Sequence, residues 1–315
     1  MSAGILLIGK NGQVGHELQH FLEPLGELVS LDRQALDLGS TNEIRRIIRE
    51  IQPLIIVNAA AYTAVDKAES DQEAAHAINA EAPRAMAEEA KKLGAAVVHY
   101  STDYVFDGSK TSPYLETDRT DPLGAYGQTK LEGEQAIRES GPAHLIFRTA
   151  WVYSTRGRNF LLTMLRLASE RQELRVVRDQ IGAPTWCREI ARGTAAVLKA
   201  LLDRGNGPQA FAAASGTYHI TAGGATSWYE FAQAILDEAR SASPDLPWFA
   251  AATQGRKIVA ERVIPITTDQ YPTPARRPAY SVLSNALLNR TFGVRLPDWR
   301  EELHAAFAEQ GTGSD

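Results

Sequence analysis

Residues 5–15 read Ile-Leu-Leu-Ile-Gly-Lys-Asn-Gly-Gln-Val-Gly, an apolar run followed directly by a loop with a glycine at every third position. The run at 5–8 predicts a strand that is buried on both faces, as in a parallel sheet. Apolar side chains then recur at helical spacing from Val14 to Leu22, which predicts a helix that the glycine loop opens. Such a loop makes a tight turn and lets the backbone approach a pyrophosphate at the helix N-terminus.

The glycine loop has the sequence context that dinucleotide binding requires. A strand precedes it, a helix follows it, and a second predicted strand at 28–31 ends in the acidic residue Asp32. A carboxylate at that point can accept hydrogen bonds from the adenosine ribose, which favours NAD, whereas the adjacent Arg33 can pair with the 2′-phosphate of NADP. The sequence therefore predicts a nicotinamide dinucleotide and leaves NADH and NADPH open.

Strands alternate with helices from the N-terminus to about residue 150. Further strands are expected at 54–57, 95–100 and 144–149. A helix is expected at 41–50, and a helical stretch over 66–92 in which Pro83 marks a helix start or a break. This alternation predicts an α/β fold with a Rossmann-type, doubly wound parallel sheet.

After residue 150 the alternation of strands and helices becomes less regular. Helices are expected at 159–171, 188–202 and 227–239, a short strand at 217–221, and irregular chain at 244–262. We therefore expect an NAD(P)-binding domain over 1–150, to which later segments return, and a smaller α/β substrate-binding domain over 151–309. Residues 310–315 are expected to form a disordered tail.

Composition limits the class of protein. A net charge of −5 over 315 residues gives no reason to expect nucleic acid or an anionic membrane as a partner. The single cysteine, Cys187, excludes a disulfide within the chain and fits a reducing cytoplasm. The N-terminus lacks the basic region and cleavage site of a secretory signal, and the longest apolar run, at 54–61, is too short to span a bilayer. We therefore expect a cytoplasmic protein.

Tyr126 and Lys130 form the candidate acid/base pair. They lie four residues apart, so on a helix they share one face. A free tyrosine titrates at about pH 10, and a nearby cation lowers that pKa, so the pair can act as a general acid/base near neutral pH. The same spacing also occurs by chance on surface helices. Thr102 follows the strand at 95–100, and ligands in such sheets bind beyond the carboxyl ends of the strands, so we expect its hydroxyl beside the cofactor.

Two other motifs, at residues 16–20 and 276–277, resemble ligand-binding sequences. Residues 16–20 match the H-E-x-x-H pattern of zinc proteases, but they lie inside the helix that the glycine loop opens, with no third ligand nearby. We therefore expect two histidines on a Rossmann helix and no zinc. Arg276 and Arg277 lie in a proline-rich loop and can bind a diphosphate, although basic loops more often lie on the solvated surface and bind nothing.

With these residues in view, the chain resembles the extended short-chain dehydrogenase/reductases and, within them, the family of dTDP-4-dehydrorhamnose reductases. The resemblance covers nearly the whole chain, in residues 9–15, 58–69, 101–106, 147–153, 179–185 and 272–278. The last three segments are more specific than the glycine loop, which many families share.

The resemblance implies a bound NADPH or NADH whose hydride goes to the 4-keto carbon of dTDP-4-dehydro-β-L-rhamnose. Tyr126 would give a proton to the developing alkoxide, Lys130 would lower the Tyr126 pKa and hold the nicotinamide ribose, and Thr102 would hydrogen-bond the reacting oxygen. The expected cofactor contacts, including the glycine loop and Arg33, are Gly9, Gly12, Gln13, Val14, Gly15, Asp32, Arg33, Asp37, Leu38, Ala61, Tyr62, Thr63, Tyr126 and Lys130. The expected contacts to the nucleotide-sugar substrate are Thr102, Asp103, Trp151, Arg276 and Arg277.

One departure from the family concerns metal. Some members bind Mg²⁺ through glutamates at a dimer interface, and Glu17 matches one such position. Arg188 stands where a second glutamate is expected, with Glu189 one residue along. On a helix of ~3.6 residues per turn, this shift rotates the side chain by about 100 degrees. We therefore expect no Mg²⁺, and either a monomer or a different homodimer.

Two other functions remain open. A nucleotide-sugar epimerase or dehydratase of the same superfamily would return the hydride to its substrate. The dehydratase type needs further carboxylates beside Thr102, where this chain has Asp103 and Tyr104 with no glutamate. A non-catalytic regulatory subunit of the methionine adenosyltransferase type would act by binding alone, but the complete set of Thr102, Tyr126 and Lys130 favours catalysis.

Overall fold

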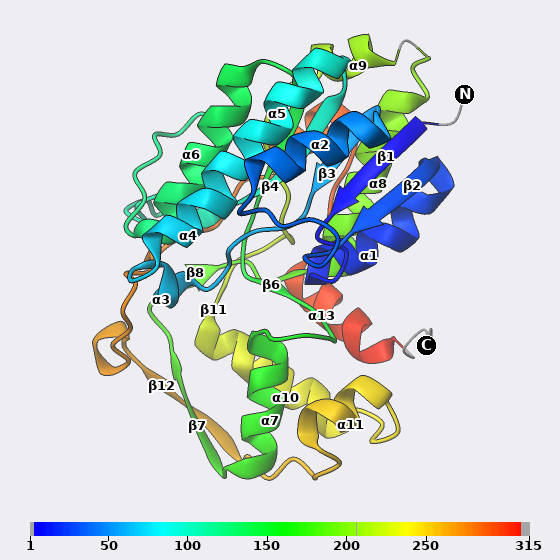
Figure 1. The fold of residues 1–315 in the computed structure, drawn as a ribbon. Helices are drawn as coiled ribbons and strands as arrows, with labels where there is room; N and C mark the ends of the chain where they lie inside the picture. The colour runs from blue at the N-terminus through cyan, green and yellow to red at the C-terminus, as the bar shows by residue number, and fades with distance from the viewer. Residues whose placement is uncertain (1–2, 206, 310–315) are drawn as a thin grey trace.

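A six-stranded parallel sheet forms the centre of the protein. The computed structural model describes residues 3–205 and 207–309, so the tail expected at 310–315 lies outside the described residues (Figure 1). The strand order is β10-β5-β4-β3-β1-β2. The strands are β1 (Ala3–Ile8), β2 (Gly26–Leu31), β3 (Ile55–Asn58), β4 (Ala96–Thr102), β5 (Ala143–Thr149) and β10 (Gly216–His219). The chain moves outward from β1 to β2 and then crosses back to β3, so the direction of winding reverses beside β1.

Both faces of the sheet are buried because successive residues of its strands point to opposite sides. Ile5 and Leu7 of β1 join one hydrophobic core, and Leu6 and Ile8 join the other. The first core is closed by α1 (Gln13–Leu22), α8 (Cys187–Leu202), α9 (Pro208–Ala213) and α12 (Ala286–Phe292). The second is closed by α2 (Thr41–Ile51), α5 (Ala82–Leu93) and α6 (Ala125–Ser140). The expected doubly wound α/β sheet is confirmed.

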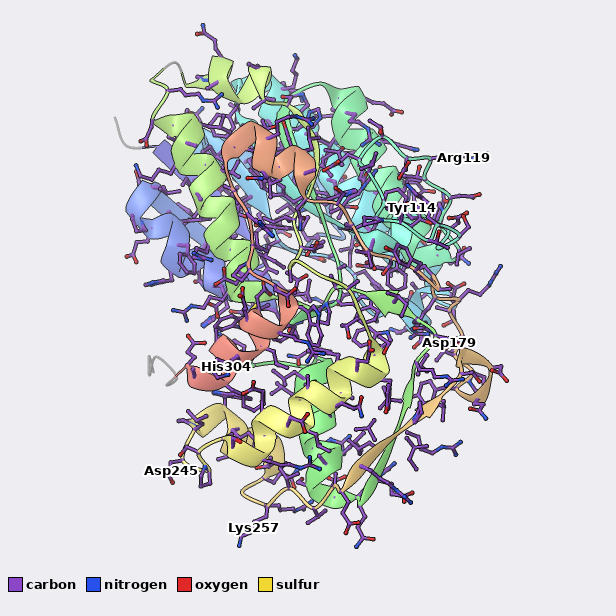
Figure 2. The ribbon with its side chains drawn as sticks, turned by 180° about the vertical axis from the view of Figure 1, so that it is seen from behind. Tyr114, Arg119, Asp179, Asp245, Lys257 and His304 are labelled. Atoms are coloured by element: carbon purple, nitrogen blue, oxygen red, sulfur yellow. The ribbon has the colours of Figure 1, made fainter. Side chains whose placement is uncertain are left out.

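A second group of elements lies below the sheet in Figure 1 and has its own hydrophobic core. Its members are α7 (Phe160–Glu170), α10 (Trp228–Ser241), α11 (Pro247–Thr253), α13 (Trp299–Ala308) and the parallel pair β7 (Glu173–Val177) and β12 (Arg262–Ile266). The view from behind shows Asp245 and Lys257 at the far end of this group, away from Tyr114 and Arg119 of the sheet layer (Figure 2). Because α8, α9, β10 and α12 pack with the sheet, the chain after residue 150 contributes to both layers.

One expectation about secondary structure is wrong. The stretch 244–262, expected to be irregular, contains α11, which begins at Pro247, where the fixed φ of proline suits a first helical residue. The stretch expected to be helical at 66–92 is divided into α3 (Val65–Ala68), α4 (Gln72–His76), a π-helical turn (Ala77–Glu81) and α5, whose first turn contains Pro83, as expected. The π-helical turn fits closely against α6, because a Cβ on Gly133 would lie 2.1 Å from the carbonyl oxygen of Asn79.

Short elements complete the described chain. They are the 3₁₀ turns Glu23–Leu25, Asp103–Val105 and Thr268–Gln270, and the two-residue strands β6 (Val152–Tyr153), β8 (Ile181–Gly182), β9 (Thr185–Trp186) and β11 (Thr226–Ser227). β6 pairs with β9, and β8 pairs with β11. None of the described helices is long and apolar enough to cross a membrane.

Candidate active site

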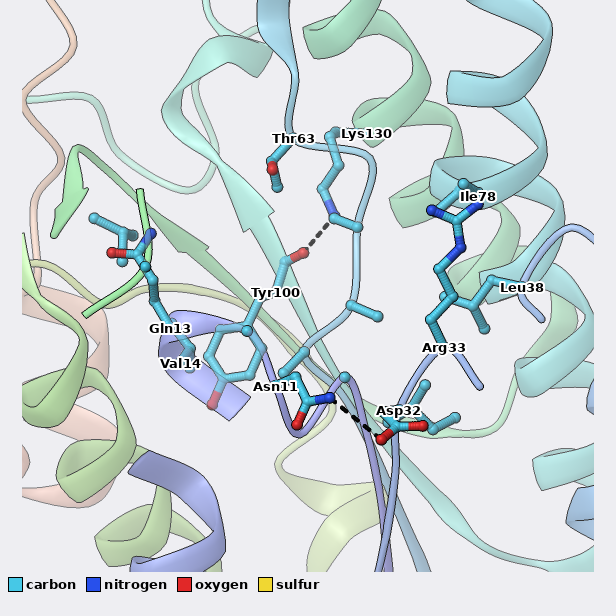
Figure 3. Close-up of a pocket in the computed structure, with 18 of the residues that line it drawn as sticks. Asn11, Gln13, Val14, Asp32, Arg33, Leu38, Thr63, Ile78, Tyr100 and Lys130 are labelled. Carbon is cyan, nitrogen blue, oxygen red and sulfur yellow. Dashed lines mark hydrogen bonds between the residues drawn. The ribbon is translucent and has the colours of Figure 1, made fainter. Parts of the chain in front are cut away.

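A cavity of about 550 Å³ opens at the carboxyl ends of β1, β3 and β4, where the winding of the sheet reverses (Figure 3). This is the position at which open α/β sheets bind their ligands. The cavity brings together these residues expected from the sequence: Gly9, Gly12, Gln13, Val14, Asp32, Arg33, Asp37, Leu38, Ala61, Thr63, Tyr126 and Lys130. Other expected residues, namely Gly15, Tyr62, Thr102, Asp103, Trp151, Arg276 and Arg277, are not among the described residues that line it.

The glycine loop has the geometry of a phosphate cradle. Gly9 has a φ of +93°, and a Cβ there would lie 2.8 Å from the backbone nitrogen of Ala60. A Cβ on Gly15 would lie 2.1 Å from the carbonyl oxygen of Gly9, so Gly15 allows the loop to pack on α1 and does not itself face the cavity. Gly12 precedes the first turn of α1 and offers no capping side chain, so the N–H groups of that turn can receive a pyrophosphate. The residues present therefore fit a dinucleotide.

The end of the cavity around Asp32 carries one anion, Asp32, and two cations, Lys10 and Arg33. Asn11 donates from Nδ2 to Oδ2 of Asp32 over 3.2 Å, as Figure 3 shows, and Nζ of Lys10 lies 3.5 Å from the same oxygen. The backbone N–H of Ala35, with smaller contributions from its neighbours, lowers the pKa of the Asp32 carboxyl. Arg33 lines the same end. Lys10 and Asn11 were missed by the sequence analysis, although both lie inside the glycine loop.

The loop after β3 is held by a buried asparagine of the π-helical turn. Asn79 accepts a hydrogen bond from the N–H of Tyr62 over 2.9 Å and donates to the Tyr62 carbonyl and to Oγ1 of Thr129, each over 3.1 Å. The Tyr62 hydroxyl is bound 3.0 Å from Oδ2 of Asp71. Ala61 and Thr63 therefore face the cavity, while Tyr62 holds the loop to its neighbours.

Tyr126 and Lys130 lie at the start of α6 and both line the cavity. The Lys130 Nζ donates to the carbonyl oxygen of Tyr100 over 2.6 Å (Figure 3). It also lies 3.3 Å from Nε2 of His99. Burial raises the pKa of Tyr126 to about 12, against a smaller opposite effect of the Thr102 hydroxyl. Burial also lowers the pKa of Lys130 to about 8.

The expected lowering of the Tyr126 pKa by Lys130 is therefore wrong for the protein without cofactor. The phenolate would be buried, and the cost of removing its charge from water exceeds the help from its polar neighbours. The Lys130 side chain is directed to the Tyr100 carbonyl.

Thr102 is the last residue of β4, Asp103 follows it, and both are buried. Oγ1 of Thr102 donates to Oδ1 of Asp103 over 3.0 Å and accepts from the N–H of Tyr104 over 3.2 Å. Burial raises the pKa of the Asp103 carboxyl to about 6, although nearby hydroxyls act in the opposite direction.

Trp151 occupies a tight aromatic setting at the boundary with the second core. Its ring stacks on that of Trp228, with centroids 3.5 Å apart and planes 5° apart. On another side, a Cβ on Gly182 would lie 2.4 Å from the Trp151 ring. Its φ of +49° is uncommon for a residue with a large side chain, so surrounding contacts must hold it. Trp228 had no distinguishing signal in the sequence.

The proline-rich loop is fastened to α3. Arg277 Nη2 lies 2.9 Å from Oδ2 of Asp66, and the N–H of Ala275 donates to Oδ1 of Asp66 over 3.2 Å. Arg277 also donates to the carbonyl of Ala275 over 3.2 Å. Arg276 is exposed. These contacts of Arg277 hold the proline-rich loop against α3, and a contact of Arg277 with substrate remains a prediction.

The surroundings of Glu17 differ from a metal site. Arg188 Nη1 lies 4.0 Å from Oε2 of Glu17 and forms an ion pair with Glu309. A guanidinium therefore lies beside Glu17. Within residues 3–205 and 207–309, no three His, Cys, Asp or Glu side chains are grouped to hold a metal ion, and His16 and His20 belong to no such group.

Several cavity residues had not been expected from the sequence. They include Ile78, Tyr100, Ser101, Thr149, Val152, Gly157 and Arg158. Oγ1 of Thr149 is buried and has no hydrogen-bond partner among the described residues, which suits a polar ligand in the cavity. Gly157 and Arg158 belong to the loop between β6 and α7, which reaches the cavity.

The dinucleotide cradle and the Tyr126–Lys130 pair, on this sheet, define a nicotinamide-dependent oxidoreductase of the short-chain dehydrogenase/reductase type. Residues 3–311 match the family described as RmlD substrate binding domain. The chain is 52% identical to the dTDP-4-dehydrorhamnose reductase of Burkholderia thailandensis, over 94% of this chain and 95% of that protein. The chain belongs to the dTDP-4-dehydrorhamnose reductase family.

Two solved structures have the same fold. The dTDP-4-dehydrorhamnose reductase of Clostridium acetobutylicum gives a TM-score of 0.83 at 39% identity, over 96% of this chain and 98% of that one. The enzyme of Bacillus anthracis, solved in complex with NADP, gives a TM-score of 0.83 at 33% identity, over 98% and 99% of the two chains.

Proposed function

We propose that this protein uses NADPH or NADH to reduce the 4-keto group of dTDP-4-dehydro-β-L-rhamnose, giving dTDP-L-rhamnose. This reaction is the final step of dTDP-rhamnose synthesis for cell-surface polysaccharide. The observation that carries the proposal is that Tyr126 and Lys130 line the same cavity as the glycine loop, in a chain of this family.

The reduced nicotinamide supplies the hydride, and the protein supplies orientation and a proton. Tyr126 gives that proton to the oxygen on which negative charge develops. A phenol whose pKa is about 12 stays protonated across the neutral range, which is the form that a proton donor needs. A donor directed at the developing alkoxide binds the transition state more strongly than the ground state.

Thr102 and Lys130 assist Tyr126. We assign Thr102 a hydrogen bond to the reacting oxygen for two reasons. Its hydroxyl lies close enough to the Tyr126 phenol to lower the pKa of that phenol, and it lies at the carboxyl end of β4. We assign Lys130 to the nicotinamide ribose, because it reaches the cavity from the same helix as Tyr126. The remaining expected cofactor contacts, including Tyr62 and Gly15, stay part of this proposal.

The substrate-binding role of the second core is also a proposal. We assign it residues 151–309, with segments returning to the sheet, and we keep Asp103, Trp151, Arg276 and Arg277 as substrate contacts. Trp151 has the best support, since its unusual backbone angle and its stacking partner hold the ring in one orientation.

The location of the protein in the cell and its oligomeric state are also part of the proposal. We place the protein in the cytoplasm, because its one cysteine, Cys187, is buried and unpaired. We propose a monomer or a homodimer without Mg²⁺, because Arg188 lies beside Glu17.

The test is the loss of reduced-nicotinamide absorbance, with NADPH and NADH supplied separately. dTDP-4-dehydrorhamnose is generated in place from dTDP-glucose by the enzymes that precede this step. Steady oxidation that depends on the sugar nucleotide supports a reductase. An epimerase or dehydratase would turn over without net oxidation. A protein that binds NADPH and oxidises neither cofactor would instead be a regulatory subunit or would act on another keto-sugar.

A further inference from the structure

A chain of buried hydrogen bonds leads from the loop after β3 to Lys130. The N–H of Ala60 donates to Oδ1 of Asn58 over 3.1 Å, and Nδ2 of Asn58 lies 3.1 Å from Nδ1 of His99. Nε2 of His99 then lies 3.3 Å from Nζ of Lys130, which donates to the Tyr100 carbonyl over 2.6 Å. Asn58 and His99 are each 1% exposed and Lys130 is 2% exposed, so water does not substitute for these partners.

The hydrogen bond from Ala60 to Asn58 decides which atom donates and which accepts in each of the following hydrogen bonds. A backbone N–H can only donate, so the Asn58 atom that faces Ala60 must be the amide oxygen. The amide nitrogen of Asn58 therefore faces His99 and can only donate to it. Nδ1 of His99 must then be the unprotonated acceptor, and a neutral His99 carries its proton on Nε2.

The proton on Nε2 faces Lys130. An ammonium has three donors and no acceptor, so it repels an N–H, whereas an uncharged amine has one lone pair that can receive it. We infer that the Asn58–His99 pair is a positioning pair that shifts the balance of Lys130 from its ammonium toward its uncharged amine, so that Lys130 loses its proton at a lower pH than it would without the pair. The ammonium is better matched by the other His99 tautomer, whose Nδ1–H would face the Asn58 amide nitrogen. Turning that amide to present its oxygen to Nδ1–H would lose the hydrogen bond from Ala60.

The charged groups around Lys130 do not remove this preference. On the next turn of α6, Glu134 favours the ammonium, but its two oxygens are held by Arg148 of β5 over 2.7 and 2.8 Å. Tyr126 lines the same cavity from the preceding turn of α6, and Asp103 after β4 acts on Tyr126, whose pKa it raises. Burial lowers the pKa of Lys130 to about 8, and it lowers the pKa of His99 well below its ordinary value, so His99 stays neutral.

The functional meaning of this pair rests on the proposed role of Lys130 at the nicotinamide ribose. The amine form of Lys130 can accept from His99 while it donates to the Tyr100 carbonyl, so the pair narrows the pH range over which the buried site holds an ammonium. His99 is not among the described residues that line the cavity, so it acts through Lys130. It is therefore a positioning residue.

The test reads proton positions directly and needs no activity, so its failure is distinct from failure of the proposed reaction. The cofactor-free protein is labelled with ¹⁵N-histidine and ¹³C-lysine and titrated by NMR, with Lys130→Met to assign the Lys130 signal. We expect His99 as the Nε2–H tautomer. In Asn58→Asp a carboxylate replaces the amide donor, so the proton should move to Nδ1 and the Lys130 midpoint should rise by about one pH unit or more.

A second variant separates the hydrogen-bond effect from added charge. Asn58→Leu removes the donor to Nδ1 of His99 without adding charge. Nε2 of His99 can then accept a hydrogen bond from the Lys130 ammonium, so the pH midpoint of the Lys130 titration should also rise. A rise in Asn58→Asp alone would show a charge effect and overturn the inference, as would an Nδ1–H tautomer in the unmodified protein. If Asn58→Leu does not fold, as judged by circular dichroism, the tautomer change in Asn58→Asp decides.

Discussion

Oγ1 of Thr102 lies 3.0 Å from Oδ1 of Asp103 and donates its only proton to that carboxylate. The same oxygen accepts from the backbone N–H of Tyr104, so the orientation of the hydroxyl is set from both sides. To bind the reacting oxygen of a substrate, the Thr102 proton must turn away from Asp103. The Thr102 hydroxyl beside Tyr126 can therefore donate to a substrate only after it gives up its hydrogen bond to Asp103.

Removal of the Thr102 hydroxyl should slow the reaction more than it weakens binding. Thr102→Val keeps the shape of the side chain and loses the donor, and we expect kcat to fall by about 10²-fold with a small change in KM. Thr102→Ser, which keeps the hydroxyl, is the matched control and should retain most of the activity. Steady-state kinetics of both variants check this, and a Val variant with nearly full kcat would remove Thr102 from the reacting oxygen.

Tyr126→Phe should keep cofactor binding and lose most turnover. The phenol is the proposed proton donor, and proton transfer by a positioned side chain contributes about 10²–10⁴-fold. The measurement pairs the dissociation constant for NADPH with kcat under saturating cofactor. If the Phe variant turned over at nearly the normal rate, another group would have to supply the proton.

The activity should fall in alkaline solution because Lys130 loses its proton. Its pKa is lowered to about 8 by burial, so the ammonium is present below that pH and is lost as the pH rises through it. At limiting cofactor, kcat/KM reports groups of the free protein and should decline above about pH 8. In Lys130→Arg the charge persists, so any remaining activity should not show this decline. The same alkaline limb in both proteins would assign it to a different group.

Asp103→Asn should stabilise the protein at alkaline pH. The folded-state pKa of about 6 lies above the ordinary value of 3.8, so the folded protein binds a proton that the unfolded chain releases in this window. Stability therefore falls as the pH rises from about 4 to about 6, and the full penalty, up to about 3 kcal/mol, is present above that window. Asparagine keeps an acceptor for Thr102 and avoids this penalty.

Thermal unfolding at pH values below and above that window tests the Asp103 effect. The gain in Tm from Asp103→Asn should be large at alkaline pH and small at acid pH. The exposed Asp245 provides a matched control, since Asp245→Asn removes the same charge from the surface (Figure 2). Equal gains from the two substitutions, or a gain that does not depend on pH, would contradict a buried charge at position 103.

Cofactor preference should respond to Arg33. A 2′-phosphate at the adenosine end would lie among Arg33, Lys10 and the Asp32 carboxylate. We expect Arg33→Ala to raise the KM for NADPH at least about tenfold, the effect of one charged hydrogen bond, and to change the KM for NADH little. Measuring both constants checks the ratio, and equal changes would place Arg33 away from the 2′-phosphate.

Local spacing was sufficient to predict the frame of the site. The glycine loop, the strands buried on both faces and the Tyr126–Lys130 helix face follow from residue size, hydrophobic periodicity and the helix repeat, which act over a few residues. The position of the cavity follows as well, because parallel strands must place their carboxyl ends at one edge. The π-helical turn at Ala77–Glu81 did not follow, since packing against α6 decided it. Helix α11 was not predicted, although Pro247 in its first turn is a local signal.

By itself, the sequence determined that the glycine loop and the Tyr126–Lys130 pair would line one cavity at the edge of the sheet. Only the tertiary structure decided how the expected site residues are held: His99 against Lys130, Trp228 against Trp151, and Arg277 against Asp66, which lies 211 positions away in the chain. These contacts join elements whose relative positions depend on the packing of whole helices and sheets. Burial from that packing also reversed the expected direction of the Tyr126 pKa, because desolvation depends on all neighbours at once and not on the spacing of one pair.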